Sequence, residues 1–505
     1  MADVNDRVVF KAYNQDQLML LPPSLDDLIE PNHPVRIVSR VIDEISIAPI
    51  VDTYKGGGAS SYDPRMLLKV LVYGYLCNIF SSRKIETSLK ENIHFMWISG
   101  MSRPDHNTIN RFRSERLTNV LKEIFSQVVM LLVDAGQISL KEAYIDGTKM
   151  EANANRYSFV WGRAIRTNEK RISEQLQQLW DYTQKIAAEE LEDVDDENFD
   201  EIDPDKVRST IERIDSALKS KPVDKKLRQK LNYAKKNWPK NLERYEEQKG
   251  VLGERNSFSK TDHDATFMRM KEDHMRNRQL KPGYNLQIST NNQFIVNYSH
   301  HPNPTDTNTL TSHLREFERL YDRMPEVAVA DAGYGSEENY LALKSAGVEA
   351  YIKYNSFDRK AKGKNRQDFT YDEDRDCYCC PAERILRRAH IHHRKTATDF
   401  IQEYVRYESI DCRGCQMRKQ CCRGQRNRTL DINRRLVLLK AEAHSRLTSE
   451  EGIYYRRKRP VEVESVFANI KHNKGFRRFN LRGMAKTEVE TGLLAMAHNI
   501  AKMAA

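Results

Sequence analysis

Two aspartates follow short apolar runs that are typical of buried strands. Asp146 comes directly after "AYI", and Asp331 comes directly after "VAVA". Converging carboxylates repel one another unless a cation lies between them, and Mg²⁺ prefers oxygen ligands. Two such ions about 3.5–4 Å apart stabilise both the attacking and the leaving oxygen in phosphodiester chemistry. An isolated aspartate in this setting forms a turn or caps a helix, so a third carboxylate has to decide between the two interpretations.

The third candidate lies in the basic stretch "RKRPVEVESVFANIKHNKGFRRFNLRG" (457–483). Pro460 predicts the start of a helix. Glu464 and Lys471 lie near one face of that helix, because seven residues make almost two turns. Such a helix presents one carboxylate to a metal and one ammonium group to a phosphate. Glu462 is a rival for the metal-ligand role, and an ordinary surface Glu/Lys pair is the alternative for both residues.

The elements around these carboxylates predict a mixed α/β sheet. A short β-type run, 142–155, precedes a predicted hairpin over 283–302, with its turn at Asn291-Asn292. A helix, the strand that ends at Asp331, a second helix and a last strand follow. We expect the catalytic core to comprise residues 137–164 and 256–354, with a helical C-terminal part over 429–505.

The first 136 residues are predicted to form an all-α DNA-binding domain. Pro64 follows Asp63 as a first-turn proline follows an N-cap. Residues 101–125 resemble a turn and a recognition helix of a helix-turn-helix unit. The side chains that would meet DNA are Asn107, Asn110, Arg111 and Arg113. A small helical bundle without DNA contacts has the same pattern.

Two insertions are expected to interrupt the core. Residues 165–255 predict a helical hairpin or coiled-coil arm with an acidic linker, since 11 acidic residues and no Lys or Arg lie between 189 and 205. Residues 355–428 contain most of the cysteines. Seven of the eight lie between Cys377 and Cys422, and the remaining one, Cys77, is predicted to be a buried core residue.

Clustered cysteines in an intracellular chain indicate a metal site more than disulfides. Cys412 and Cys415 have the C-x2-C spacing that lets two thiolates bind one tetrahedral ion. The predicted structural Zn²⁺ site is completed by Cys380 and Cys421. Three other cysteines are alternatives, namely Cys377, Cys379 and Cys422, and reduced metal-free thiols are the alternative to zinc. The nearby histidines, His390, His392 and His393, are expected on the surface or facing DNA.

The composition fits a polyanionic partner. The 505-residue chain has a formal net charge of +10 and a pI near 9.0, and residues 451–483 carry nine Lys or Arg against three Glu. A generally basic surface is the alternative. The N-terminus lacks the pattern of a secretory signal, and no apolar run is long enough for a transmembrane helix. We therefore expect a cytoplasmic protein that does not bind membranes.

These segments together resemble the DDE transposases of bacterial insertion sequences. "AYIDGTKMEANAN" is similar to the segment of the first aspartate, "VAVADAGYGSEENY" to that of the second, and "VEVESVFANIKHNKGFRRFNLRG" to the glutamate segment with a lysine seven positions later. "YDPRMLLKVLVYGYLCNIFSSRKIE", "TDHDATFMRM" and "KPGYNLQIST" also resemble the group. In one respect the sequence departs from the pattern, because Arg459 stands one residue further from Glu464 than is usual, whereas Tyr455 and Lys458 are in register with Glu462.

The resemblance implies a ribonuclease-H-like core in which Asp146, Asp331 and Glu464 hold two Mg²⁺ ions, or Mn²⁺. It further implies cleavage at the element's terminal inverted repeats and joining to target DNA. The phosphate contacts would come from Arg459, Lys471, Arg477 and Arg478. A homodimer in a synaptic complex, associated with the bacterial nucleoid when bound to DNA, is expected. A DNA-binding regulator with a degenerate core and a nuclease without strand transfer are the competing functions.

Overall fold

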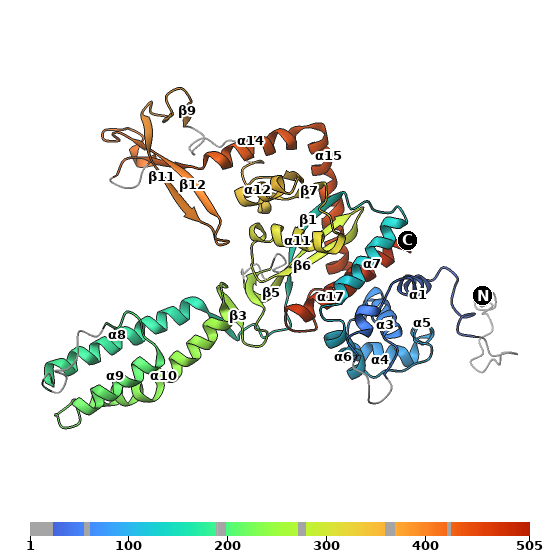
Figure 1. Ribbon diagram of the computed structural model, residues 1–505, viewed down its shortest axis with the longest axis horizontal. Helices are drawn as coiled ribbons and strands as arrows, with labels where there is room; N and C mark the ends of the chain where they lie inside the picture. Colours follow the sequence, from blue (N-terminus) through green and yellow to red (C-terminus); the bar gives the residue numbers. More distant parts are fainter. Residues whose placement is uncertain are drawn as a thin grey trace, which may run out of the picture.

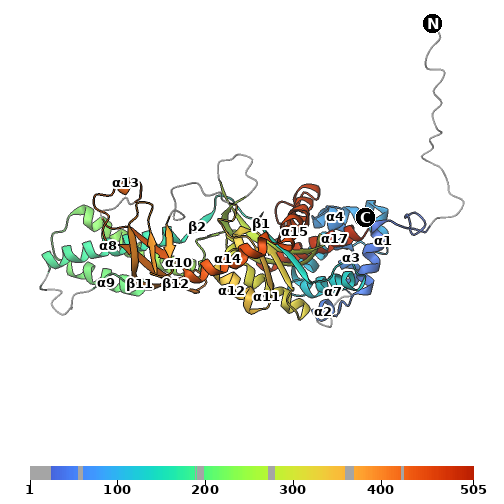
Figure 2. The same ribbon diagram turned by 90° about the horizontal axis from the view of Figure 1, so that it is seen from above.

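The computed structural model describes residues 24–54, 61–187, 189, 198–270, 279–358, 369–421 and 426–504. Three parts extend from one central body (Figure 1). A bundle of N-terminal helices lies at one end, and a long helical arm and a small β-domain extend toward the other. The view from above shows the same elongated arrangement (Figure 2). Within the described chain, no helix combines the length and the apolar composition needed to cross a membrane.

The central body contains a six-stranded mixed sheet with the order β4-β5-β1-β7-β8, and β6 pairs with β5. Its strands are β1 (Glu142–Glu151), β4 (Thr266–Arg269), β5 (Leu280–Asn291), β6 (Phe294–His301), β7 (Val327–Ala330) and β8 (Glu349–Ile352). β1 is antiparallel to β5 and parallel to β7, which is parallel to β8. The predicted mixed α/β fold is therefore confirmed. The hairpin turn lies one residue later than predicted, at Asn292 and Gln293, which both have a positive φ.

Helices cover both faces of this sheet. They are α11 (Leu310–Tyr321), α12 (Glu337–Ser345), α14 (Arg434–Thr448) and α15 (Glu450–Arg459). Ala143 and Ala328 pack toward α11 and α12, whereas Tyr144 and Val329, one residue later on each strand, pack against Tyr455 of α15. This alternation follows from the two-residue period of a strand. The chain beyond α15 therefore approaches the sheet from the side of Tyr144.

The helical run of α15 continues without a break through three short elements. They are the π-helical turn η7 (Pro460–Glu464), α16 (Ser465–Ala468) and a second π-helical turn, η8 (Asn469–Asn473). The prediction that Pro460 starts a helix is wrong, because the helix runs through it. Proline lacks an N–H and clashes with the preceding turn of an α-helix, and a local π turn is a common way to accommodate such a defect.

The N-terminal helices share one hydrophobic core with the sheet. They are α1 (Pro34–Glu44), α2 (Ala48–Val51), α3 (Pro64–Leu76), α4 (Ser82–Glu91), α5 (Ile93–Ile98), α6 (His106–Arg111), the π-helical turn η2 (Phe112–Arg116) and α7 (Leu121–Asp134). The C-terminal helix α17 (Met484–Met503) lies between them and β6, and is buried along most of its length. Asp63 caps α3 by accepting hydrogen bonds from Arg65 N and Met66 N, as its Asp-Pro pattern predicts. Cys77 is the exposed C-cap residue of α3, so its predicted place in the core is wrong.

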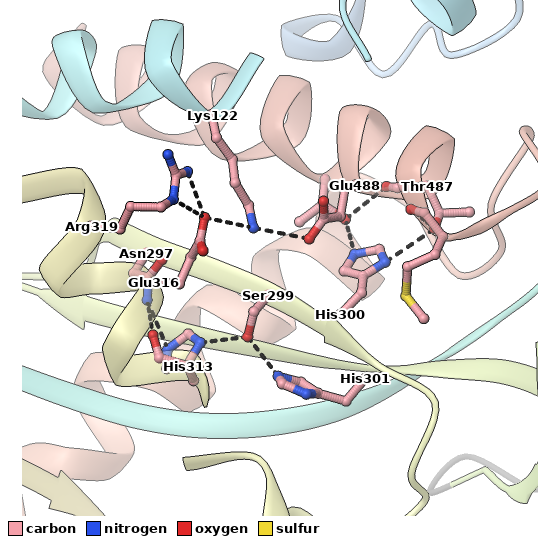
Figure 3. A network of polar contacts seen from close by, with 12 residues as sticks. Lys122, Asn297, Ser299, His300, His301, His313, Glu316, Arg319, Thr487 and Glu488 are labelled. Atoms are coloured by element: carbon pink, nitrogen blue, oxygen red, sulfur yellow. Dashed lines mark hydrogen bonds and ion pairs between the residues drawn. The ribbon is translucent and has the colours of Figure 1, made fainter. Parts of the chain in front are cut away.

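A buried polar network joins β6 to the helices around it (Figure 3). His300 contacts Thr487 and Thr491 of α17, at 3.1 and 2.8 Å. His313 contacts Ser299 at 2.7 Å and lies on the other face of the strand. Burial lowers the pKa of His300 to about 3 and that of His313 well below its usual value. Both imidazoles are therefore neutral at neutral pH.

The arm consists of α8 (Gly162–Ile186), α9 (Pro204–Ala217) and α10 (Lys225–Leu252). It leaves and re-enters the body through the antiparallel pair β2 (Phe159–Trp161) and β3 (Ser257–Ser259). Its three helices enclose a hydrophobic core of their own that includes Trp180, Ile211 and Trp238. The predicted helical insertion is confirmed, with three helices in place of a hairpin. Most of the predicted acidic linker, at 190–197, lies outside the described residues.

The Cys-rich insertion folds as a five-stranded antiparallel sheet with the order β13-β12-β11-β10-β9. The strands are β9 (Thr370–Asp372), β10 (Cys377–Cys379), β11 (Ile385–Lys395), β12 (Ile401–Ser409) and β13 (Thr429–Ile432), and a short helix, α13 (Arg418–Cys421), precedes β13. Leu386, Val405, Tyr407 and Leu430 form its small core. The sequence does not predict this sheet, because β11 is exposed along most of its length and lacks an apolar period of two.

Candidate active site

Asp146 and Asp331 occupy equivalent positions on neighbouring parallel strands. β1 and β7 pair over three residues, and the last pair joins Tyr144 to Val329. Asp146 and Asp331 lie two residues beyond that pair, and their carboxylates meet the same atom, Arg459 NH2. Asp331 directly follows β7, as predicted. Asp146 lies inside β1, because β1 continues alongside β5 after β7 has ended.

Each aspartate has one oxygen fixed by a nearby backbone N–H. Gly147 N donates to Oδ1 of Asp146 at 2.8 Å, and Gly333 N donates to Oδ1 of Asp331, also at 2.8 Å. The second oxygen of each carboxylate, Oδ2, faces the helical run of α15 and η7, where it meets Arg459. Two backbone hydrogen bonds therefore orient two carboxylates toward one point.

Arg459 is the residue on which the three predicted carboxylates converge. Its NH2 atom lies 3.2 Å from Asp146 Oδ2 and 3.9 Å from Asp331 Oδ2, and its NH1 atom lies 3.4 Å from Glu464 Oε1. The Arg459 side chain is 14% exposed, against 9% for Asp146, 41% for Asp331 and 59% for Glu464. One guanidinium thus faces three acidic groups, of which only Asp146 is deeply buried.

The π-helical turn η7 explains the unusual spacing between Arg459 and Glu464. In an α-helix, residues four apart lie near one another on the surface, and residues five apart do not. A π turn closes hydrogen bonds between residues five apart and so brings them to the same side. The extra residue relative to the usual family pattern is therefore absorbed by η7, and Arg459 still contacts Glu464.

Glu462 faces away from this point. Its Oε2 accepts a hydrogen bond of 2.7 Å from Gln293 N in the turn between β5 and β6, and its Oε1 lies 3.7 Å from Lys458 Nζ. Lys458 also pairs with Glu142, and only 3% of Glu462 is exposed. The structure thus groups Glu464, and not Glu462, with the two aspartates, whereas Glu462 and Lys458 anchor the helical run to the sheet.

The predicted phosphate contacts do not form a single surface. Lys471 is buried with 8% exposure, and its carbonyl accepts a hydrogen bond from Arg477 Nε. Arg478 donates to the carbonyls of Ala152 and Ala154, and thereby ties the end of the helical run to the end of β1. Arg477 and Arg478 are exposed, so both remain accessible to DNA while they make these contacts.

In the N-terminal domain, one of the four residues predicted to contact DNA is buried. Asn107 and Arg111 are exposed on α6, and Asn110 is half-buried. Arg113 is 3% exposed and donates to Tyr75 Oη, to Phe80 O and to Asn110 Oδ1. The guanidinium is therefore used inside the helical bundle, and this arrangement does not favour its predicted contact with DNA.

Sequence reasoning missed three polar residues beside the two aspartates. Asp306 accepts hydrogen bonds from Asn285 Nδ2 at 2.8 Å and from Gln287 Nε2 at 3.0 Å. A Cβ atom on Gly147 would lie 2.6 Å from Asp306 Oδ1, so this carboxylate adjoins the residue that follows Asp146. The available signal was the alternation in "GYNLQ", which places Asn285 and Gln287 on one face of β5.

The chemistry of the three carboxylates fits a divalent cation, although their arrangement is that of a guanidinium site. Carboxylate oxygens are the ligands that Mg²⁺ prefers. In the part of the chain that the structure describes, no three His, Cys, Asp or Glu side chains are grouped so that they could hold a metal as they stand. Arg459 occupies the point on which Asp146, Asp331 and Glu464 converge.

The cysteines of the described segments do not form a metal-binding group either. Cys380 Sγ and Cys412 Sγ each accept a backbone N–H, from Arg384 and Arg428 respectively, at 3.3 Å. The predicted set of Cys380, Cys412, Cys415 and Cys421 is not gathered into a metal-binding group among the described residues, and Cys422 lies outside them.

Comparison with protein families finds two transposase domains in the chain. A profile described as Transposase domain (DUF772) matches residues 23–115, and one described as Transposase DDE domain matches residues 379–504. Both matched families are transposase families, and together they support the assignment of the chain to the DDE-type transposases. The second match contains Glu464 and Arg459, whereas the segments of Asp146 and Asp331 lie outside both. The comparisons of this transposase with curated proteins and with solved structures gave no match.

Proposed function

We propose that this transposase cleaves DNA at the ends of its insertion sequence and joins the freed 3′ ends to target DNA, with divalent metal held by Asp146, Asp331 and Glu464. The observation that carries the proposal is the convergence of these three carboxylates on Arg459. One guanidinium leaves an excess of negative charge at this point. That excess favours divalent cations over monovalent ones.

The roles of the residues follow from their contacts. Bound Mg²⁺ would activate the attacking oxygen and stabilise the leaving oxygen of the phosphodiester. Asp146 and Asp331 each present one oxygen, since the other is held by a glycine N–H. Glu464 is the most exposed of the three and lies on the side open to a DNA strand. Arg459, once displaced from the carboxylates, is placed to bind a phosphate beside the scissile bond.

DNA binding is assigned to two regions of the molecule. Asn107 and Arg111 on the exposed side of α6 are candidates for contact with the terminal inverted repeats, and Arg477 and Arg478 for contact with phosphates near the scissile bond. Two element ends have to be joined in concert, so we expect a homodimer in the synaptic complex.

The proposal is tested with purified protein, Mg²⁺ and a plasmid that carries the element ends, beside Asp331→Ala. Asp322→Ala is the matched control, because Asp322 is an exposed aspartate at the C-terminal end of α11. Joined products with the wild type and the control, and none with Asp331→Ala, support strand transfer. Cleavage without joining favours the nuclease, and retarded DNA mobility without cleavage favours the regulator. Equal joining by Asp331→Ala contradicts the assignment of the site.

Structural zinc is a separate part of the proposal. It rests on the C-x2-C pair Cys412 and Cys415 and on the N–H bonds to Cys380 and Cys412. Metal analysis of the purified protein decides it. About one zinc ion per chain supports the site, and a content well below one removes it.

A further inference from the structure

Asp306 connects three segments that end beside the two aspartates. It lies at the start of the short 3₁₀ helix η4 (Asp306–Asn308), between β6 and α11. Its Oδ1 accepts hydrogen bonds from the amides of Asn285 and Gln287 on β5. Those side-chain amides belong to residues that are 1% and 0% exposed. A carboxylate oxygen that accepts two buried N–H groups fixes their orientation, because a buried donor left unpaired is destabilising.

Gln287 transmits this arrangement to the strand of Asp146. Gln287 lies directly opposite Gly147 in the pairing of β1 with β5. A Cβ atom on Gly147 would lie 2.2 Å from Gln287 Nε2 and 2.6 Å from Asp306 Oδ1. The glycine therefore makes room for both side chains. Any shift of Asp306 or Gln287 changes the packing on the residue next to Asp146.

The same group of residues holds the loop that follows Asp331. Tyr334 donates a short hydrogen bond to Gln287 Oε1, and Thr307 Oγ1 donates to Gly333 O at 2.9 Å. A Cβ atom on Gly333 would lie 3.7 Å from Asp306 Oδ2. Burial, followed by the charges of Asp306, Asp146 and Asp331, raises the pKa of Tyr334 well above its usual value, so its hydroxyl remains a donor.

We propose that Asp306 is a positioning residue of the catalytic centre, which acts through Gln287 and Thr307 to fix the segments that carry Asp146 and Asp331 beside one another. This inference rests on the proposed function in one respect, namely that these two aspartates bind the metal. Partners of metal ligands that lie one contact further out change metal affinity or activity by about 10–100-fold when they are removed.

Two substitutions separate the effect of the hydrogen bonds that Asp306 accepts from the effect of its negative charge. Asp306→Ala removes the acceptor. Asp306→Asn keeps an oxygen that accepts from both amides, and its new NH₂ group replaces Oδ2, which makes no hydrogen bond or ion pair within the described chain. Asp322→Ala, at the other end of α11, is the matched control.

The experiment measures Mn²⁺ binding by titration calorimetry, the rate of strand joining at saturating DNA, and thermal stability for each variant. We expect Asp306→Ala to weaken Mn²⁺ binding and to slow joining, each by about 10–100-fold. Asp306→Asn should stay within a few-fold of the wild type, as should the control. A residue with a merely structural role would lower thermal stability and leave the Mn²⁺ affinity of the folded protein unchanged.

The outcomes remain distinct from a failure of the proposed function. In one outcome, the wild type binds Mn²⁺ and Asp306→Ala weakens that binding, while neither protein joins DNA. That result supports the positioning role of Asp306 and contradicts the proposed strand transfer. If Asp306→Ala keeps wild-type Mn²⁺ affinity and joining rate, the inference is wrong. It is also wrong if Asp306→Asn is as impaired as Asp306→Ala. Should Asp306→Ala not fold, Tyr334→Phe removes the donor to Gln287 alone, and unchanged Mn²⁺ affinity there overturns the proposal.

Discussion

Replacing Arg459 with alanine should make the stability of the protein depend on divalent metal. In the wild type, the guanidinium neutralises Asp146 at 3.2 Å, and the Asp146 side chain is only 9% exposed. Removing one partner of a buried ion pair leaves an uncompensated charge, which destabilises by about 3–5 kcal/mol. Asp331 and Glu464 are 41% and 59% exposed, so solvent screens them and each adds at most about 1 kcal/mol.

The predicted magnitude is therefore set by Asp146. A loss of about 3 kcal/mol lowers Tm on the order of 5–10 °C for a domain of ordinary size. A divalent ion that binds the three carboxylates replaces the missing positive charge. At about 100 times its Kd, such an ion returns about 2.7 kcal/mol. In the wild type the same ion first has to displace Arg459, so its stabilising effect is smaller.

The assay is thermal unfolding of dialysed protein with and without added Mn²⁺, for the wild type, Arg459→Ala and Arg457→Ala. Arg457 is an exposed arginine on the same helix and serves as the control. We expect a lower Tm for Arg459→Ala without metal and a larger gain on adding Mn²⁺ than in the other two proteins. An unchanged Tm without metal, or an equal gain in all three proteins, would refute the interpretation of Arg459 as the counter-ion of this site.

Two further predictions concern the rival glutamate and the buried histidines. Glu464→Gln should abolish strand joining and leave Tm within about 1 °C of the wild type, since the Glu464 side chain is 59% exposed. Glu462→Gln should lower Tm and retain joining, because it weakens the hydrogen bond that Glu462 accepts from Gln293 N. The reverse pattern would identify Glu462 as the metal ligand. The folded-state pKa of His300 is about 3, against a usual value of about 6.5, so its neutral form stabilises the protein fully above pH 6.5 and less at lower pH. Denaturant unfolding should show a loss of about 2 kcal/mol from this residue between pH 7 and 5, and His300→Gln should remove that part of the pH dependence; an identical dependence in both proteins contradicts it.

The sequence was sufficient for elements whose patterns are local. The apolar run before Asp331 and the Asp63-Pro64 cap each define an element by themselves, and both are in the structure. The convergence of Asp146 and Asp331 also follows from sequence, because two strand-end aspartates in a parallel pair reach the same level of the sheet.

Other features depend on contacts that no local pattern contains. The choice between Glu462 and Glu464 depends on one π turn, which rotates every later side chain. Arg113 has the spacing of a recognition-helix residue, yet its guanidinium donates hydrogen bonds to Tyr75 Oη and Phe80 O inside the bundle. Asp306 precedes a helix in the sequence like any capping residue, and only the pairing of β5 with β1 brings it to the site.

The most direct test of the central claim, that these carboxylates bind the catalytic metal, is a change of metal preference. Mg²⁺ is a hard ion that prefers oxygen, whereas Mn²⁺ accepts softer ligands more readily. Asp331→Cys should lose strand joining in Mg²⁺ and recover at least about tenfold in Mn²⁺, and Asp331→Ala should recover in neither. Equal responses of the two variants to Mn²⁺ would contradict direct metal binding by Asp331 and, with it, the proposed catalytic centre.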